Sequence, residues 1–249
     1  MSLPKIFALL LLSSTASAQG VKADNGTITL HYYNRPPFLY QDAAGHVKGI
    51  LAERAEKIMQ QAGIHYRWEN TPVTRILFHL EHSKRNDCAP GWYFSAEREK
   101  FAWYSKPVYR DLPVVIISKN QRFAAAPGNL ASILNTAGIR ILLKRGLLHN
   151  SELQEQLRKP LPASIEYSVA EMPVMLGMIE NGRADLTIVT QEEASYYASL
   201  PQWASRQLQI SKIAGLNTAD PRYILCSKSV TPEVMQKINT AIDKLLPKP

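Results

Sequence analysis

The segment ITLHYYNRPPFLYQDAAGHVKGI, residues 28–50, holds the pattern that decides the fold. Its first part, Ile28 to Tyr33, is rich in β-branched and aromatic residues and predicts a strand. Proline lacks a backbone donor, so the Pro36-Pro37 pair ends that strand, and Asp42 to Gly45 form a turn. Apolar residues then recur at helical spacing up to Gly63. The segment therefore begins a strand–turn–helix unit.

The same alternation of strands and helices occurs twice along the chain. Strands that alternate with helices indicate a mostly parallel sheet covered by helices. The two α/β units are joined without a linker rich in Gly or Ser, so we expect two rigid lobes with a cleft between them, a preferred place for ligands. The predicted strands are 28–33, 64–68, one near 88–89, 114–118, 139–143, 164–168, 184–189 and 223–227, and the predicted helices are 51–62, 73–82, 130–135, 151–158, 171–181, 192–198 and 231–246.

Composition excludes several classes of protein. The chain has 249 residues, of which 45% are hydrophobic and 20% charged, so disorder, collagen-like repeats and small disulfide scaffolds do not fit. The net charge is +8, but no basic run exceeds the pairs Lys84-Arg85 and Lys144-Arg145. A scattered excess does not predict nucleic acid as a partner. It favours acidic solutes or a well-solvated surface, and both interpretations stay open.

The N-terminus predicts export. Lys5 precedes a short apolar run, Ile6 to Leu12, and Ala16-Ser17-Ala18 fits a signal-peptidase site. The run is shorter than the roughly 20 residues that a membrane span needs. We therefore expect residues 1–18 to be a cleaved signal peptide and the protein to be periplasmic and not embedded in a membrane. The alternatives are an uncleaved anchor and a buried helix.

Two cysteines, Cys88 and Cys226, would then lie in an oxidising compartment. Neither has a CxxC partner, so neither predicts a zinc site or a redox motif. An even count suggests a disulfide, and the alternative is two separate buried thiols. If paired, they close a loop of 138 residues, for which the chain-entropy model gives roughly 4–5 kcal/mol as an upper bound.

Motifs for catalysis or cofactors do not occur in the sequence. It has no G-x-S-x-G elbow, no P-loop and no G-x-G-x-x-G. His79 and His82 are three residues apart, whereas zinc helices prefer four, so they are interpreted as a polar helix face. We expect no metal and no cofactor.

Four segments carry a resemblance to a known family. Residues 28–50, the block SAEREKFAWYSKPVY at 95–109, Gly182 to Asp185, and the C-terminal return from Ile224 to Lys228 resemble bacterial extracellular solute-binding proteins of family 3. The resemblance covers essentially the whole mature chain. It implies a type II periplasmic-binding-protein fold, in which two α/β lobes are joined by a two-segment hinge.

The resemblance also implies the boundaries of the lobes. Lobe 1 would comprise residues 19–107 and 220–249, and lobe 2 residues 108–219. The hinge would lie near 106–113 and 213–222. In that topology the return strand lies beside the strand that carries Cys88, which favours a Cys88–Cys226 bridge.

On the lobe 1 side, the resemblance implies that Arg98 grips a ligand carboxylate, since a guanidinium offers a planar fork of donors. The alternative is a surface arginine paired with a neighbouring glutamate. Aromatic side chains near it could stack on a planar or sugar-like solute, or pack in the core. The further candidates here are Trp92, Tyr93, Tyr32, Arg35, and Arg75, which faces either cleft or solvent.

On the lobe 2 side, the sequence departs from the family pattern. Gly146 remains, but leucine follows where the family has a threonine hydroxyl. The family's aspartate for a ligand ammonium falls near Thr190 and Gln191, and a shift of register would substitute Glu192. Burying an unpaired ammonium is costly, so the pattern favours an anionic or neutral polar solute over an ordinary amino acid.

The leading interpretation is a periplasmic solute-binding protein, not an enzyme. It would close two lobes on a small solute as a monomer and serve an ABC permease or a membrane receptor. One alternative is an enzyme of the same fold, dehydratase-like, with Glu192 as the acid or base. Another is a sensor or accessory protein whose cleft has lost its ligand.

Overall fold

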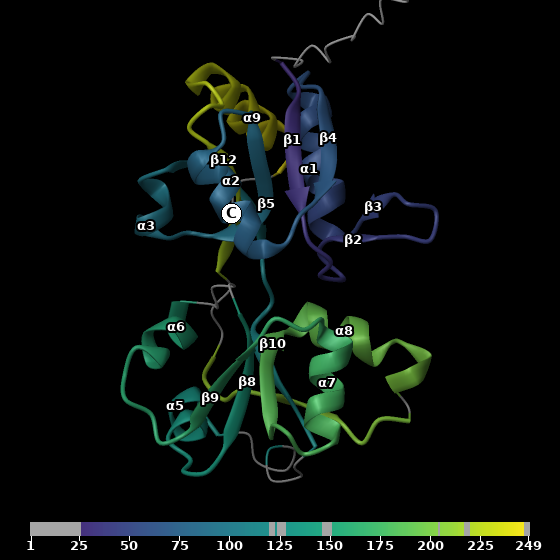
Figure 1. Cartoon of the computed structure of the whole chain (residues 1–249), viewed down its shortest axis with the longest axis vertical. Helices are drawn as coiled ribbons and strands as arrows, with labels where there is room; N and C mark the ends of the chain where they lie inside the picture. The colour runs from purple at the N-terminus through teal and green to yellow at the C-terminus, as the bar shows by residue number, and fades with distance from the viewer. Residues whose placement is uncertain are drawn as a thin grey trace, which may run out of the picture.

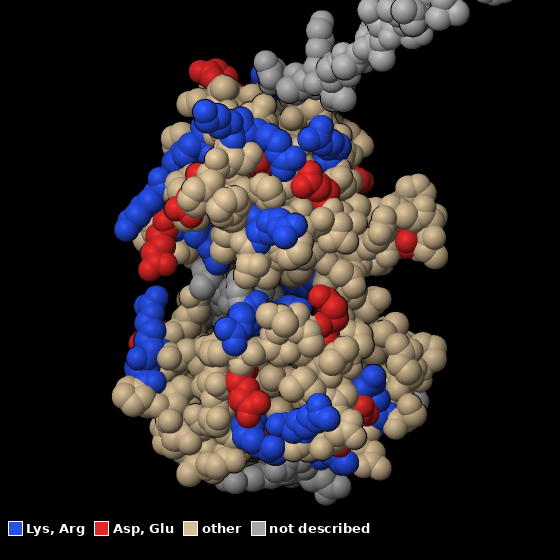
Figure 2. Space-filling model, in the orientation of Figure 1, with Lys and Arg blue, Asp and Glu red and all other residues tan. Residues whose placement is uncertain are grey.

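The structure of the chain is a computed structural model that describes residues 26–119, 123, 128–145, 151–203, 205–216 and 220–246. It has two five-stranded sheets, each in its own α/β lobe, and the two lobes meet at a waist (Figure 1). In the view of Figure 2, basic side chains are spread over both lobes and lie among acidic ones. The predicted signal peptide lies outside the described residues. No helix in the described part is long and apolar enough to cross a membrane.

The lobe 1 sheet has the strand order β4-β1-β5-β12-β6. β1 runs parallel to both β4 and β5, while β12 runs antiparallel to β5 and β6. The antiparallel direction arises because β12 returns from lobe 2 and enters the sheet beside the last residue of β5, with Arg222 opposite Tyr93. The strands are β1 (Ile28–Tyr32), β4 (Tyr66–Asn70), β5 (Asp87–Tyr93), β6 (Ala102–Arg110) and β12 (Pro221–Ser227), and the hairpin β2 (Tyr40–Gln41) and β3 (Val47–Lys48) lies beside them.

The helices of lobe 1 cover this sheet. The first helix of lobe 1 begins directly after Gly49. The φ angle of Gly49 is 115°, and a Cβ there would lie 2.5 Å from the backbone oxygen of Phe38, so only glycine fits at this position. Its residues Leu51, Ala55 and Ile58 are buried at the spacing that predicted the helix. The lobe 1 helices are α1 (Ile50–Gln61), α2 (Val73–His82), α3 (Ala96–Glu99) and α9 (Pro232–Leu245).

The lobe 2 sheet has the strand order β11-β7-β10-β8-β9. β8 is parallel to β9 and β10, and β7 is antiparallel to β10 and β11. The strands are β7 (Val114–Ser118), β8 (Arg140–Lys144), β9 (Ser164–Ser168), β10 (Leu186–Thr190) and β11 (Gln209–Lys212). The helices are α5 (Leu130–Leu134), α6 (Ser151–Leu157), α7 (Met172–Glu180), α8 (Gln191–Ala198) and the short 3-10 helix η1 (Pro201–Trp203).

The chain passes twice between the sheets. It leaves lobe 1 after Arg110 and enters β7 at Val114, and it returns between Leu216 and Pro221, where residues 217–219 are not described. β1 and β5 of lobe 1 and β8 and β10 of lobe 2 all have their carboxyl ends at the waist. Ligands of open α/β sheets bind outside such carboxyl ends, so the waist is the place to look for a site.

The two cysteines form a disulfide, as predicted. Cys88 of β5 lies directly opposite Cys226 of β12, and their Cα atoms are 4.0 Å apart. Both are fully buried in the lobe 1 core. The bridge therefore ties the returning strand to the N-terminal part of the same sheet.

Replacing both cysteines, Cys88→Ala with Cys226→Ala, is expected to lower the free energy of unfolding by roughly 2–4 kcal/mol, because the denatured chain gains the freedom of an open loop. Urea denaturation of the double variant beside the oxidised protein measures this loss. Solute binding should be unchanged, since neither cysteine lines the waist cavity. A loss below about 1 kcal/mol would contradict the expected contribution of the bridge.

Candidate functional site

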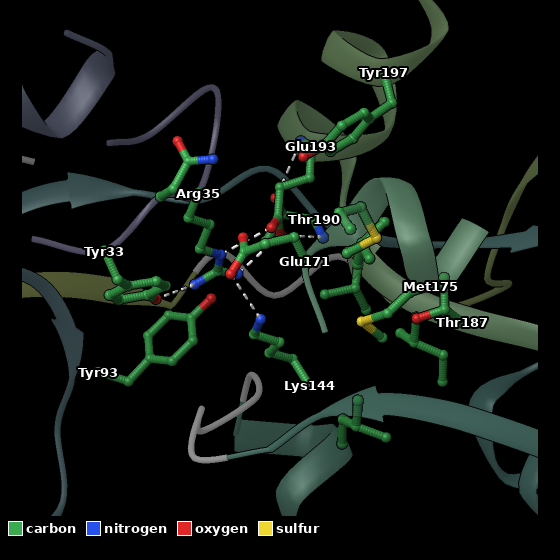
Figure 3. Close-up of a pocket in the computed structure, with 16 residues that line it drawn as sticks. Tyr33, Arg35, Tyr93, Lys144, Glu171, Met175, Thr187, Thr190, Glu193 and Tyr197 are labelled. Atoms are coloured by element: carbon green, nitrogen blue, oxygen red, sulfur yellow. Dashed lines mark hydrogen bonds and ion pairs between the residues drawn. The ribbon is translucent and has the colours of Figure 1, made fainter. Parts of the chain in front are cut away.

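A cavity lies between the lobes at the waist (Figure 3). It holds about 670 Å³ of empty space, part of it open to solvent. Its lobe 1 wall includes Tyr33 and Arg35, which follow β1, and Tyr93, the last residue of β5. The same three residues also line a smaller adjoining recess, whose other walls are Gly91, Trp92, Arg98 and Arg222. The two spaces are adjacent, and the recess on the lobe 1 side is lined by three arginines, so we treat them together as the candidate site.

An ion pair between Arg35 and Glu193 crosses the cleft. Two guanidinium nitrogens of Arg35 donate to the two carboxylate oxygens of Glu193, each over 2.8 Å. The side chains are 16% and 5% exposed. Burial alone would lower the pKa of Arg35, but the Glu193 carboxylate, together with Tyr33 and Tyr93, raises that pKa well above its ordinary range. A bidentate, desolvated pair of this kind holds the lobes together.

Glu193 is held in place by the start of its own helix. Thr190 is the N-cap of α8, and its hydroxyl oxygen accepts from the backbone N–H of Glu193. The Glu193 carboxylate accepts in turn from the backbone N–H of Thr190. This reciprocal pair is a capping box, so the residue that faces Arg35 has little freedom to turn away.

Glu193→Gln is expected to open the ligand-free cleft. Burial alone would raise the pKa of Glu193, but Arg35 and then Arg222 lower it. The contribution of the charged pair to closure is therefore complete above the ordinary glutamate pKa of about 4.3 and is lost as pH falls through the lowered value. Small-angle scattering should give a larger radius of gyration for Glu193→Gln at neutral pH and a smaller difference from the wild type in acid.

Glu171→Gln is the matched control. The Glu171 carboxylate forms an ion pair with the Lys144 ammonium, with 3.3 Å between Oε1 and Nζ, and both residues belong to lobe 2. The same chemical change there removes a cavity charge without breaking a contact between lobes. An unchanged radius of gyration in Glu193→Gln would contradict the assigned role of the cross-lobe pair.

Arg98 lies in the wall of the recess. Its guanidinium carbon is 4.6 Å from the centroid of the Trp92 ring, a stacked cation–π contact, and its side chain hydrogen-bonds Tyr104. It is 8% exposed, and in the described part of the chain it forms no ion pair. Burial lowers the pKa of Arg98, but a guanidinium stays charged at physiological pH. The charge of the Glu97 carboxylate acts on Arg98, but the two form no ion pair among the described residues, so the recess holds a buried guanidinium with room for an anionic partner.

Arg222 differs from Arg98, because its charge is compensated. Its Nε donates to Asp111 over 2.5 Å, and its other nitrogens donate to the Gly91 carbonyl and the Tyr93 hydroxyl. Tyr93 in turn donates to the other oxygen of Asp111. Asp111 lies on the outgoing crossing and Arg222 is the second residue of β12, so this network ties the outgoing crossing to the start of the returning strand.

The structure places the sequence-predicted residues as follows. On the lobe 1 side, Arg35 and Tyr93 line both the cavity and the recess, and Trp92 and Arg98 line the recess. On the lobe 2 side, Thr190 lines the cavity. Their roles in binding stay predictions. Gln191 follows Thr190 as the first residue of α8 and is not among the lining residues. Gly146 lies outside the described residues.

Besides Gln191, three further predicted residues are not brought to the cavity. Tyr32 points into the lobe 1 core, where its ring meets Trp68 edge to face. Arg75 is exposed on α2. Glu192 accepts from the Tyr109 hydroxyl and the Leu112 backbone N–H, both over 2.7 Å, so its carboxylate supports the crossing between the lobes.

Several residues that line the cavity were not predicted from the sequence. Glu193 had a signal, because a threonine followed three residues later by glutamate is a capping box, and the second position of that box reaches back toward the strand end. Lys144 and Glu171 had no such pattern. Asp111 and Arg222 are far apart in the sequence and meet only through the crossing.

The arrangement can bind but offers little for chemistry. Both carboxylates that line the cavity, Glu193 and Glu171, are ion-paired, so neither is a free general base. Among the described residues no group of His, Cys, Asp and Glu could hold a metal ion. The fold and the cavity define a two-lobed protein with a pocket lined by side chains of both lobes.

Comparison with known proteins identifies the family. The model of bacterial extracellular solute-binding proteins, family 3, matches residues 28–248, and the chain belongs to this family. No curated protein matches the sequence significantly. The predicted type II periplasmic-binding-protein fold is confirmed.

Solved structures with this fold include three informative neighbours. An ancestral arginine-binding protein bound to arginine has a TM-score of 0.71 at 18% identity, with 88% of this chain and 92% of that chain covered. AbpA, an amino acid ABC transporter substrate-binding protein from Streptococcus pneumoniae bound to L-arginine, has a TM-score of 0.70 at 18% identity, with 88% of this chain and 89% of that chain covered. The ancestral amino acid-binding protein AncCDT-1, a precursor of cyclohexadienyl dehydratase, has a TM-score of 0.67 at 19% identity, with 88% of each chain covered.

Proposed function

We propose that the protein captures a small solute bearing a carboxylate, closes its lobes on it, and presents it to an ABC permease or a membrane receptor. One observation carries the proposal: the Arg98 guanidinium is buried in the cleft, stacked on Trp92 and not ion-paired within the described chain. A buried charge is costly unless it is paired, and a ligand carboxylate supplies the missing partner. Export to the periplasm by a cleaved signal peptide, residues 1–18, belongs to the same proposal.

An anionic solute suits the cleft better than the arginine bound by structural neighbours. The carboxylate of arginine could pair with Arg98, but its ammonium and guanidinium would need acids of their own. The cavity carboxylates Glu193 and Glu171 are already paired with Arg35 and Lys144. A cationic group would therefore have to displace an existing ion pair.

Binding also fits the site better than catalysis. The one acid that the sequence suggested for a dehydratase-like reaction, Glu192, contacts Tyr109 and the Leu112 backbone at the crossing instead of the cavity. Side chains of both lobes line the cavity, which favours a ligand-binding protein over one that has lost its ligand.

Isothermal titration calorimetry with the purified mature protein tests this function. We expect heat of binding for organic anions such as acetate, succinate and isocaproate, and none for L-arginine at matched concentrations. Tight binding of L-arginine, or no binding of any carboxylate, would overturn the proposal.

A further inference from the structure

The cavity next to the recess extends into lobe 2, where two parallel strands separate. β10 pairs with β8 at only two positions, Leu186 with Ile141 and Thr187 with Leu142. β8 instead follows β9 along its whole length, up to Lys144 opposite Ser168. The carboxyl ends of β8 and β10 therefore part, and the cavity occupies the wedge, since consecutive β10 residues and Lys144 all line it.

The walls of this wedge are mostly apolar. β7, α6 and α7 contribute aliphatic and thioether side chains, whereas the lobe 1 end of the cavity is formed by arginine and tyrosine (Figure 3). Methionine is unbranched and polarizable, so it adapts to hydrocarbon groups of varied shape. We define the lobe 2 chamber as Val114, Leu153, Met172, Met175, Ile188 and Val189.

The charged groups next to the chamber are already compensated. Lys144 donates to the carbonyls of Val169 and Ala170 and to the Glu171 carboxylate. Glu193 is taken by Arg35. Within the described residues, the chamber thus offers a ligand apolar contact and no free acid for an ammonium group.

We propose that the lobe 2 chamber binds a hydrocarbon group of the solute, so that the solute is a carboxylate with an apolar body and without an ammonium group. This inference rests on the proposed function, because the carboxylate at Arg98 sets the direction in which the body extends. An ammonium on the carbon next to the carboxylate would lie between the recess and the chamber, beside Arg35 and without a free acid.

A matched ligand series tests the chamber by titration calorimetry. Acetate, isocaproate and hydrocinnamate share the carboxylate and differ in the body, while leucine and phenylalanine add only the ammonium. Burial of each added methylene favours binding, so we expect isocaproate to bind at least roughly 30-fold more tightly than acetate. Leucine should bind at least roughly 30-fold more weakly than isocaproate, because its ammonium loses water without gaining a partner.

A variant pair localises the effect to the chamber. Met172 is partly buried and lines the cavity, whereas Met178 lies on the same helix and does not line it. Met172→Gln is expected to weaken isocaproate binding by roughly fivefold or more and to leave acetate unchanged, since the tail then meets a polar group. Met178→Gln should change neither.

The outcomes separate this inference from the proposed function. If succinate or acetate binds as well as isocaproate, or if Met172→Gln has no selective effect, the chamber is not the site of a hydrocarbon group, although the Arg98 site stands. If leucine binds more tightly than isocaproate, the inference is also overturned, because an ammonium partner must exist. If no carboxylate binds at all, the proposed function itself fails.

Discussion

Arg98→Met should remove most of the affinity for carboxylate ligands. Truncating one partner of a buried, hydrogen-bonded charge pair costs roughly 2–5 kcal/mol, which is a factor of about 30 or more in the dissociation constant. Methionine keeps much of the volume beside Trp92 but cannot donate a hydrogen bond. Calorimetry with isocaproate, or with the anion that binds most tightly, measures the loss.

Two further variants make this result specific. Arg75→Met makes the same change on the exposed face of α2 and should bind as the wild type does. Arg98→Lys keeps the charge but loses the planar fork, so its affinity should fall between those of the wild type and Arg98→Met. Near wild-type affinity in Arg98→Met, with thermal unfolding unchanged, would show that the carboxylate binds elsewhere.

Asp111→Asn should lower the free energy of unfolding by roughly 3–5 kcal/mol, because breaking a buried ion pair leaves an uncompensated charge. The charge left behind is Arg222, whose side chain is 2% exposed. Asparagine has nearly the shape of aspartate, so the change removes charge and little volume. Urea denaturation followed by circular dichroism gives the loss, and the same variant should also loosen the waist, where Asp111 of the outgoing crossing is tied to β12.

The control for this prediction is an exposed pair in the same lobe. Lys106 donates to Asp243 on the surface, where both side chains are more than two-fifths exposed. Asp243→Asn should therefore cost less than about 1 kcal/mol. Equal losses for the two variants would contradict the distinction between the buried and the exposed pair.

Much of the fold could be predicted from local patterns. The helix Val73–His82 and the strands Val114–Ser118 and Ser164–Ser168 have the predicted bounds, and most other elements differ from prediction by one or two residues at an end. The strands β6 and β11 were not predicted. Both are edge strands in which buried residues are scattered among exposed ones over short or proline-containing segments, so they lack the continuous apolar run of a central strand.

The site was harder to predict, because it depends on which way each side chain points. Glu192 and Glu193 are neighbours at the start of α8, but successive residues of a helix lie about 100° apart, so one supports the crossing and the other faces Arg35. Tyr32 and Tyr33 are likewise neighbours at the end of β1, where one points to the core and the other to the cavity. Sequence spacing without three-dimensional contacts could not separate the members of these pairs.

The central claim is that a carboxylate-bearing solute lies between the lobes against Arg98. A crystal structure of the protein with the tightest-binding anion from the calorimetric series tests it most directly. We expect the carboxylate oxygens to accept from the Arg98 guanidinium and side chains of both lobes to contact the solute. A carboxylate bound away from Arg98, or on the outer surface of one lobe, would contradict it.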